Sequence, residues 1–520
     1  MALADRHFVT AEAAAGVDAG AVLFGEAPPS IEDIVAIARH GARLDISSVV
    51  EDRILASRAV IERHVAANAP VYGLTTALGA SVDTRLSEDD LAGFQRRTVP
   101  AHTVGVGAPA RTDAVRAMMA ARAAGMAAGG AGVSLPVFRG LVAALNARLH
   151  PVVPSLGSIG AADLSQLCHM ASVLLGEGEA EFGGIILPAG EALSAAGLRP
   201  IELGPKDGHA LMVANSYSVG YACLVLDDLG RLFGWLEAAA ALDFEALRAN
   251  LSVLDDRALA ARPAFGQRLA AERLRALLAG SGLWDSSAAR RIQDPLCYRC
   301  VPQVFGALLH ARGQARAATE IELASSGDNP VILAEDGVII SHGNFDLTAF
   351  VLAWEQLGQA LVHTATGTAY RCLKIMSPGF SDLPRFLTPL GQSRTGFSTV
   401  QKTISALEAE IRHMALPASF APLPAADGVE DQASMAPTVI SKTAAIVERL
   451  RYLAAIELML AAQAVELADV RASLGTGTAA AYALVRRLVE PLTDDRAPSP
   501  DINRLAAEIE VRDWTVRPAQ

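Results

Sequence analysis

The stretch Pro154-Ser-Leu-Gly-Ser-Ile-Gly-Ala-Ala-Asp163 is a glycine-punctuated turn that leads into an apolar segment ending near Gly176. Gly157 and Gly160 permit backbone angles and close approaches that a Cβ would forbid. Asp163 stands where an acidic residue suits the start of a helix. The stretch therefore predicts a special loop that enters a buried helix, and the rest of the chain is interpreted around it.

The composition predicts a large, mainly helical protein. The chain has 520 residues, of which 51% are hydrophobic and only 5% aromatic, and it is rich in alanine and leucine. The segments with helical periodicity after residue 205 are 209–245, 256–278, 300–324, 346–371, 399–415 and 436–471. One apolar face is marked at spacings of four and three by Val400, Ile404, Leu407, Ile411 and Met414. We predict an all-α fold with a central bundle of long helices.

Three consecutive regions are predicted from turns and linkers. Residues 1–205 form an N-terminal helical lobe, in which 31–68 reads as helical, residues 206–495 form the long-helix bundle, and 496–520 form a C-terminal tail. The N-terminus lacks the pattern of a signal peptide. The charge-free stretch from His209 to Leu226 contains several polar residues, which favours a buried helix over a membrane span.

Charge and cysteine usage narrow the class of protein. The net charge of −12 argues against a nucleic-acid-binding surface. The five cysteines are few and odd in number, which is typical of a reducing cytoplasm. Cys297 and Cys300 are separated by two residues but have no second pair, and no metal motif with ligand spacing is present. We expect a cytoplasmic protein without a metal, with no nucleic acid or membrane as partner.

Several separate segments, covering roughly residues 40 to 470, match one family. They are Val71-Tyr-Gly-Leu-Thr-Thr-Ala-Leu-Gly79, the loop of His102 before Gly105-Val-Gly107, Gln293-Asp-Pro-Leu-Cys-Tyr-Arg-Cys-Val-Pro-Gln303, Asp328-Asn-Pro330, Gly343-Asn-Phe345 and Glu430-Asp-Gln-Ala-Ser-Met435. With the turn at 154–163 they resemble the histidine and aromatic amino acid ammonia-lyases. This resemblance implies the all-α fold of the histidine ammonia-lyase and aspartase superfamily, and a homotetramer with sites shared between subunits.

The departures from the family pattern fall at positions of its chemistry. The family's Ala-Ser-Gly tripeptide, which cyclises into an electrophilic methylidene-imidazolone group, is here reduced to Ala161 and Ala162. Leu296 replaces a tyrosine, Val213 an asparagine and Asp346 a histidine. We therefore expect no such cofactor, while Tyr72 and Arg299 remain.

Ten residues are predicted to act in the site, most of them from the resemblance; Lys402 is included although the family resemblance has an uncharged residue at its position. The predicted catalytic residues are Tyr72, Lys402, Glu430 and His102. The predicted substrate-binding residues are Arg299, Gln293, Gln303, Phe345, Asp346 and Asn215. Simpler interpretations stay open, because Lys402 can be a solvated surface residue, His102 can organise its loop and Glu430 can cap a helix.

The chemistry of an elimination explains why these residue types are needed. A base such as Tyr72 removes a weakly acidic proton β to a carboxylate, and an arginine clamps that carboxylate in two places. Without the imidazolone, the nitrogen must leave unaided, as a quaternary trimethylammonium group does. We expect a cofactor-free carbon–nitrogen lyase of the ergothionase branch, which releases trimethylamine from a histidine-derived betaine. The alternatives are an ammonia-lyase acting on histidine or an aromatic amino acid, and a catalytically dead helical scaffold.

Overall fold

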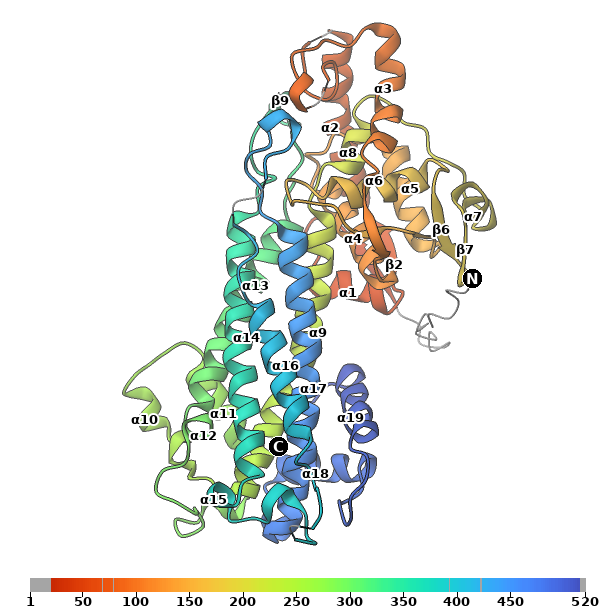
Figure 1. Ribbon diagram of the computed structural model, residues 1–520. Helices are drawn as coiled ribbons and strands as arrows, with labels where there is room; N and C mark the ends of the chain where they lie inside the picture. The colour runs from red at the N-terminus through yellow and green to blue at the C-terminus, as the bar shows by residue number, and fades with distance from the viewer. Residues whose placement is uncertain (1–19, 68, 78, 392, 421–422, 515–520) are drawn as a thin grey trace. The chain divides into compact units, whose positions relative to one another are not determined.

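The computed structural model describes residues 20–67, 69–77, 79–391, 393–420 and 423–514. Helices dominate these residues, and the strands among them are short (Figure 1). This confirms the predicted all-α class. The first eight residues, from which the absence of a signal peptide is inferred, lie outside the described residues.

The chain divides into two compact units, each built from three segments. The first unit comprises Met1–Leu224, Ala318–Thr348 and Ser419–Thr438, and the second comprises Val225–Ala317, Ala349–Ala418 and Val439–Gln520. This division differs from three consecutive regions, because two later segments return to the first unit. It also places the described residues of the predicted tail in the second unit, where they contain helix α19 (Ser499–Val511).

The first unit combines helices with small sheets. Its helices are α1 (Ile31–Arg39), α2 (Ser48–Ala66), α3 (Glu88–Ala101), α4 (Thr112–Ala127), α5 (Leu135–Asn146), α6 (Leu164–Leu174), α7 (Ala189–Ala195) and α8 (Asp207–Met212). Its strands are β1 (Ala21–Phe24), β2 (Arg43–Ile46), β3 (Val106–Pro109), β4 (His150–Pro151), β5 (Pro154–Leu156), β6 (Glu179–Phe182), β7 (Ile185–Pro188), β8 (Val331–Leu333) and β9 (Val338–Ile340). The pairs are β1 with β2 in parallel, and β3 with β5, β4 with β6, β6 with β7 and β8 with β9 antiparallel. The helical reading of 31–68 is therefore wrong at its centre, where strand β2 separates α1 from α2.

Two local features explain how α1 and β2 arise. Ser30 and Asp33 form a reciprocal capping box, in which the Asp33 N–H donates to Ser30 Oγ at 3.1 Å and the Ser30 N–H donates to Asp33 Oδ2 at 2.8 Å. The helix ends at Arg39, shortly before Gly41, whose φ of +71° suits a residue without a Cβ. The following residues then pair with β1.

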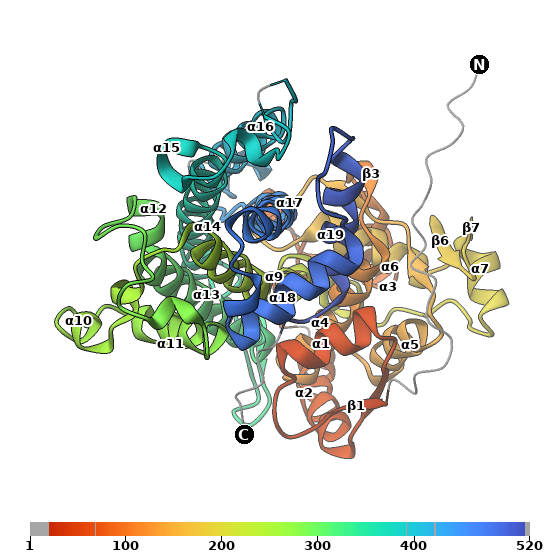
Figure 2. The ribbon, with the colours of Figure 1, turned by 90° about the horizontal axis from the view of Figure 1, so that it is seen from below.

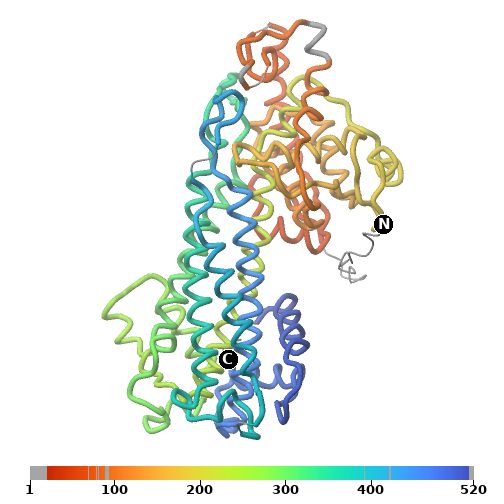
Figure 3. Tube along the Cα trace, in the orientation of Figure 1, coloured from red at the N-terminus to blue at the C-terminus, as the bar shows by residue number. Residues whose placement is uncertain are grey.

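The long helices contribute the bundle of the second unit. They are α9 (Ser216–Leu247), α13 (Val301–Leu323), α14 (Thr348–Ile375), α16 (Val400–Met414) and α17 (Ala436–Ala468), and the unit boundaries fall inside α9, α13, α14 and α17. Within the second unit, α9, α13, α14 and α17 run side by side (Figures 1 and 2), and the Cα trace follows the same bundle (Figure 3). The shorter helices are α10 (Asp256–Ala260), α11 (Gln267–Leu277), α12 (Leu296–Arg299), α15 (Pro378–Ser381) and α18 (Thr476–Leu488).

The apolar faces predicted from the sequence are mostly buried. Val400, Ile404 and Ile411 of α16 are buried, as the spacing predicts. The stretch Asp207–Leu247 is the one described helical segment long and apolar enough to cross a membrane, and 89% of its most apolar window is buried inside the protein. Its apolar character is accounted for by packing in the protein core.

Candidate active site

The signature loop, defined as residues 157–163, is held by another segment of the first unit, residues 434–436. The Met435 N–H donates to Ile159 O at 2.8 Å, and Ser434 Oγ donates to Gly160 O at 3.0 Å. Gly160 has a φ of +76°, and a Cβ there would lie 2.6 Å from Ser434 Oγ. The loop therefore needs glycine at this position both for its backbone angle and for the close approach of residues 434–436.

The prediction that Asp163 acts at the start of the helix that follows it is wrong. It directly precedes α6, but its side chain makes no capping bond to that helix. Asp163 instead accepts hydrogen bonds from the Ser218 N–H at 2.8 Å and from Ser158 Oγ at 3.1 Å, so it satisfies the first turn of α9. The side chain is fully buried, and this burial raises the pKa of the carboxyl to about 6 despite these hydrogen bonds.

The residues of the signature loop do not fit a methylidene-imidazolone group. That group needs a serine to lose its hydroxyl and a glycine after it, whereas only Ala161 and Ala162 lie between Gly160 and Asp163. Ala161 forms a backbone bridge with Asp346, and Ala162 takes a left-handed φ of +64°. The loop thus keeps a tight, strained backbone without the side chain from which the group is made.

Tyr72 lies in a turn that other segments of the first unit fix in place. The Gly79 N–H donates to Tyr72 Oη at 3.2 Å, so the phenol oxygen already has one donor directed at it. Gln95 of α3 donates to Gly73 O at 2.9 Å and accepts from the His209 N–H at 3.0 Å. Gln95 therefore connects the Tyr72 turn to helix α8.

His209, which is not among the ten predicted site residues, is a neighbour of Tyr72. The two rings meet edge to face, with centroids 5.9 Å apart. Burial, with the nearby charges of Lys206 and Arg122, lowers the pKa of His209 well below its ordinary value, so the imidazole is neutral. His209 Nδ1 is buried and has no hydrogen-bond partner within the described residues. In the sequence, His209 is marked only by its position two residues after Asp207, and this position does not distinguish a functional histidine from one packed in the core.

The remaining candidates of the first unit occupy three segments around the signature loop. Asn215 Nδ2 donates to Phe345 O at 2.7 Å, which fixes the backbone of residue 345. Asp346 caps α14, because its Oδ1 accepts from the Thr348 N–H at 2.9 Å. His102 directly follows α3 and is half-buried, with its Nδ1 2.8 Å from Thr98 O of that helix.

Glu430 lies on a short turn that reaches the Tyr72 loop. Its backbone pairs with Ala425, and the side chain is half-buried. Between these two residues, Ala426 lies against Gly79, where a Cβ on the glycine would be 3.7 Å from the Ala426 Cβ. The structure thus gathers Tyr72, Asn215, Phe345, Asp346 and Glu430 on connected segments of the first unit.

The other four candidates belong to the second unit. Arg299 ends the one-turn helix α12, and its Nη1 donates to Gln293 Oε1 at 3.2 Å in an exposed setting. Gln303 lies on α13, and its Oε1 is buried with no partner in the described part of the chain. Among the residues that the structure describes, Gln293 is the one side-chain hydrogen-bond partner of Arg299, which leaves the other guanidinium donors available for a ligand.

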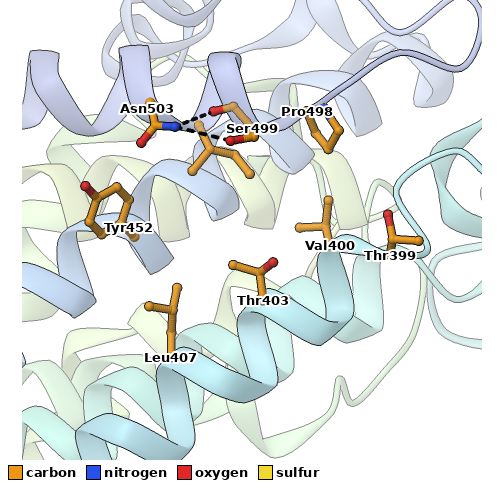
Figure 4. Close-up of a pocket in the computed structure, with 9 residues that line it drawn as sticks. Thr399, Val400, Thr403, Leu407, Tyr452, Pro498, Ser499 and Asn503 are labelled. Atoms are coloured by element: carbon orange, nitrogen blue, oxygen red, sulfur yellow. Dashed lines mark hydrogen bonds between the residues drawn. The ribbon is translucent and has the colours of Figure 1, made fainter.

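Lys402 lies on the exposed face of α16. Its side chain is exposed, as are Ala406, Ala409 and His413, which share its stripe. The same helix borders a cavity of about 330 Å³ between α16, α17 and α19 (Figure 4). The cavity is lined by Thr399, Val400, Thr403, Leu407, Tyr452, Pro498, Ser499, Ile502 and Asn503. It contains none of the ten candidates and no carboxylate, amine, guanidinium or imidazole, so it does not correspond to the predicted site.

Metal and disulfide chemistry find no support among the described residues. No group of three or more His, Cys, Asp or Glu side chains in the described ranges is arranged to hold a metal ion. All five cysteines are free thiols, and Cys168, Cys223 and Cys372 are buried.

The mainly helical fold, the glycine turn at residues 157–163 and the loop tyrosine Tyr72 are together those of a lyase of the ammonia-lyase type. The chain belongs to the aromatic amino acid lyase family, whose family model matches residues 30–487. This is a family of carbon–nitrogen lyases.

Relatives and solved structures cover nearly the whole chain. It is 36% identical to histidine ammonia-lyase from Alkaliphilus oremlandii over 92% of this chain and 94% of that protein, and 38% identical to histidine ammonia-lyase from Sorangium cellulosum over 93% and 96%. The crystal structure of the ergothioneine-degrading enzyme ergothionase from Treponema denticola, in complex with desmethyl-ergothioneine sulfonic acid, matches with a TM-score of 0.90 at 32% identity, over 94% of this chain and 98% of that one. Histidine ammonia-lyase from Trypanosoma cruzi matches with a TM-score of 0.86 at 29% identity, over 94% and 92%.

Proposed function

We propose that the protein eliminates trimethylamine from a histidine-derived betaine, converting ergothioneine to thiourocanate without a prosthetic group. The observation that carries this proposal is a signature loop with no serine between Gly160 and Asp163, in a family member that retains Tyr72 and Arg299. A free amine leaves poorly and benefits from an electrophile, whereas a trimethylammonium group departs as a neutral amine. The similarity to ergothionase from Treponema denticola supports the same assignment.

The proposed reaction starts with proton transfer to Tyr72. As the phenolate, Tyr72 takes a proton from Cβ of the betaine, and the electron pair of that C–H bond becomes the Cα=Cβ double bond. The Cα–N bond breaks at the same time or after, and its electrons leave with trimethylamine. The Gly79 N–H directed at Tyr72 Oη stabilises negative charge on that oxygen before the transfer. The neutral imidazole of His209 contributes no positive charge that would repel the trimethylammonium group.

Substrate binding in this proposal relies on the second set of residues. Arg299 grips the carboxylate in two places, and Gln293 and Gln303 support that end of the substrate. Lys402 stabilises charge that develops on the ring or its sulfur, while Phe345 and Glu430 face the trimethylammonium group. Asp346 and Asn215 hold the ring side of the site, and His102 assists proton transfer. We further propose a cytoplasmic homotetramer with sites shared between subunits.

A specific observation favours one alternative. The chain is 36% and 38% identical to two proteins named histidine ammonia-lyase, so an ammonia-lyase that gives urocanate or an aryl acrylate is the second candidate. It would require an electrophile that residues 157–163 do not supply.

The test compares three substrates with one purified protein. Ergothioneine, hercynine and L-histidine are supplied separately, and trimethylamine or ammonia is quantified together with the ultraviolet absorbance of the conjugated acrylate. Trimethylamine from ergothioneine, lost in Tyr72→Phe, supports the proposal. Ammonia from L-histidine would replace it with the alternative, and turnover of none of the three would contradict both.

A further inference from the structure

Four helices of the second unit bring together a buried polar cluster, defined as Asp243 of α9, Tyr298 of α12, Arg371 of α14 and Glu457 of α17. Each of these side chains is at most 2% exposed. None of them belongs to the ten predicted site residues, yet Tyr298 is the immediate neighbour of Arg299 in the chain. The cluster therefore includes the residue directly before Arg299, the proposed carboxylate clamp.

The contacts of the cluster lead from the bundle into helix α12. Arg371 binds Glu457 with two bonds, from Nε to Oε1 at 2.5 Å and from Nη2 to Oε2 at 3.0 Å. Arg371 Nη1 also donates to Cys297 O at 3.3 Å, and Tyr298 Oη donates to Asp243 Oδ1 at 3.1 Å. Two consecutive residues of α12 are thus tied to the bundle by polar contacts.

Helix α12 depends on such contacts because it is very short. It spans only Leu296–Arg299, and a single turn is not stable on its own. At its start Leu296 is 66% exposed, so this residue adds little packing. The position of Arg299 is therefore set by the anchors at 297 and 298.

The charges of the cluster balance only if one proton is retained. Asp243 and Glu457 are two carboxyls that share one guanidinium, so full ionisation would leave a net negative charge in the core. Burial and the neighbouring Glu457 raise the pKa of Asp243 well above its ordinary value, and burial also raises the pKa of Glu457. Asp243 Oδ2 faces no donor in the described residues, and its carboxyl neighbour is Glu457. A proton on Asp243 turns that contact into a hydrogen bond.

The other titratable groups around the cluster do not replace this proton. Cys297 and Cys372 lie beside it, and burial raises the pKa of both thiols, so they stay neutral. The charge of Lys374 also affects the pKa of Cys297, which it lowers. Lys374 Nζ lies over the ring of Phe380, 3.5 Å from the ring centroid. The balance of charge inside the cluster is therefore decided by Asp243, Glu457 and Arg371.

We propose that Asp243 and Glu457 share one proton, and that the neutral cluster they form with Arg371 positions Arg299 through the Tyr298 hydroxyl and the Cys297 carbonyl. Asp243 and Tyr298 are then positioning residues for the clamp. The identity of the ligand that Arg299 binds rests on the proposed function, whereas the shared proton and the anchoring of α12 do not depend on it. Loss of the proton at alkaline pH is expected to loosen α12.

The first experiment measures α12 directly, without turnover. Hydrogen–deuterium exchange of residues 292–303, corrected for the intrinsic effect of pH, is followed from pH 6 to 10 in the wild type, Asp243→Asn and Tyr298→Phe. In Asp243→Asn the amide is a permanent donor toward Glu457. Protection of residues 292–303 against exchange should therefore stay constant with pH in this variant, whereas in the wild type it should fall at alkaline pH. Tyr298→Phe should be less protected at every pH, and Tyr370→Phe on the exposed face of α14 serves as the matched control.

Stability against pH provides a second readout of the same proton. Above the ordinary aspartate pKa of about 4, the folding equilibrium constant of the wild type should fall relative to that of Asp243→Asn by up to about tenfold per pH unit, until Asp243 ionises in the folded protein. Asp336→Asn, in the exposed turn between β8 and β9, should show no such change. Parallel pH curves for the wild type and Asp243→Asn, in both stability and exchange, would overturn the shared proton.

A double-mutant cycle tests the link to Arg299. Tyr298→Phe should lower kcat/KM for the betaine roughly 10- to 100-fold, mainly through KM, because the clamp is displaced. In an Arg299→Lys background the same substitution should cost less than about twofold, since the clamp is already weakened. Equal costs in both backgrounds would refute the positioning role. If the wild type turns over no betaine, the exchange and stability curves alone decide the proposal, and the failure then belongs to the proposed function.

Discussion

Replacing Tyr72 with phenylalanine separates a catalytic role from a structural one. The substitution removes the oxygen that accepts the Gly79 N–H at 3.2 Å, but it keeps the ring that meets His209. Tyr72 and Gly79 are both half-buried, so water can reach the freed N–H. The loss of this one hydrogen bond should lower the free energy of unfolding by only about 0.5–1.5 kcal/mol.

The catalytic cost of the same change should be several times larger. Removal of a general base typically slows a reaction about 10²- to 10⁴-fold, which corresponds to roughly 3–5.5 kcal/mol of activation free energy. The assay measures kcat for trimethylamine release alongside urea unfolding of the same preparation, with Tyr370→Phe as control. A loss of kcat below about fivefold would refute the assignment of Tyr72 as base, because it lies far outside the range expected for a base.

Three further changes test other parts of the site. Arg299→Lys should raise KM about 10- to 100-fold, because a bidentate contact becomes a single one. The free energy of unfolding should change little, because the one side-chain hydrogen bond of Arg299 among the described residues is to the exposed Gln293; substrate titration and a urea curve measure the two quantities. As pH rises from 4 to 6, the free energy of unfolding of Asp163→Asn should increase relative to that of the wild type, by up to about 3 kcal/mol. The reason is that the Asp163 carboxyl has a pKa of about 6 in the folded protein and about 4 in the unfolded chain, so its ionisation destabilises the wild-type fold in this range. A difference between variant and wild type that is the same at pH 4 and pH 7 would contradict this. Gly160→Ala should destabilise the first unit by about 1–3 kcal/mol, since its Cβ would meet Ser434 Oγ at 2.6 Å, and a melting temperature equal to that of the wild type would show that residues 434–436 can move aside.

The long helices and the family were predictable because their signals are local. The spacing of Val400, Ile404 and Ile411 marks a face that the structure buries. The glycines at 157 and 160 both take left-handed backbone angles, as a tight turn requires. Sequence periodicity also identified α13, α14 and α17 within a few residues of their ends.

The features that were missed depend on partners far apart in the chain. Asp163 looked like a cap for the helix that follows it, but its partner Ser218 is 55 residues away at the start of α9. The interaction between Asp243 and Glu457 joins two helices over an even longer separation, and each residue alone reads as an ordinary charge in a helix. Lys402 shows the opposite case, because its stripe of small residues predicts close packing and the side chain is exposed in the single chain. The roles of all ten candidates stay predictions until they are tested.

The bridge made by Gln95 has a consequence for engineering the enzyme. Because the Gln95 side-chain amide bonds both Gly73 O and the His209 N–H, the Tyr72 turn and helix α8 are both held in position by helix α3. A turn transplanted from a relative in order to change substrate preference would lose its support unless residue 95 and the start of α8 were transplanted with it. Libraries that vary the turn should therefore vary these three segments as one block.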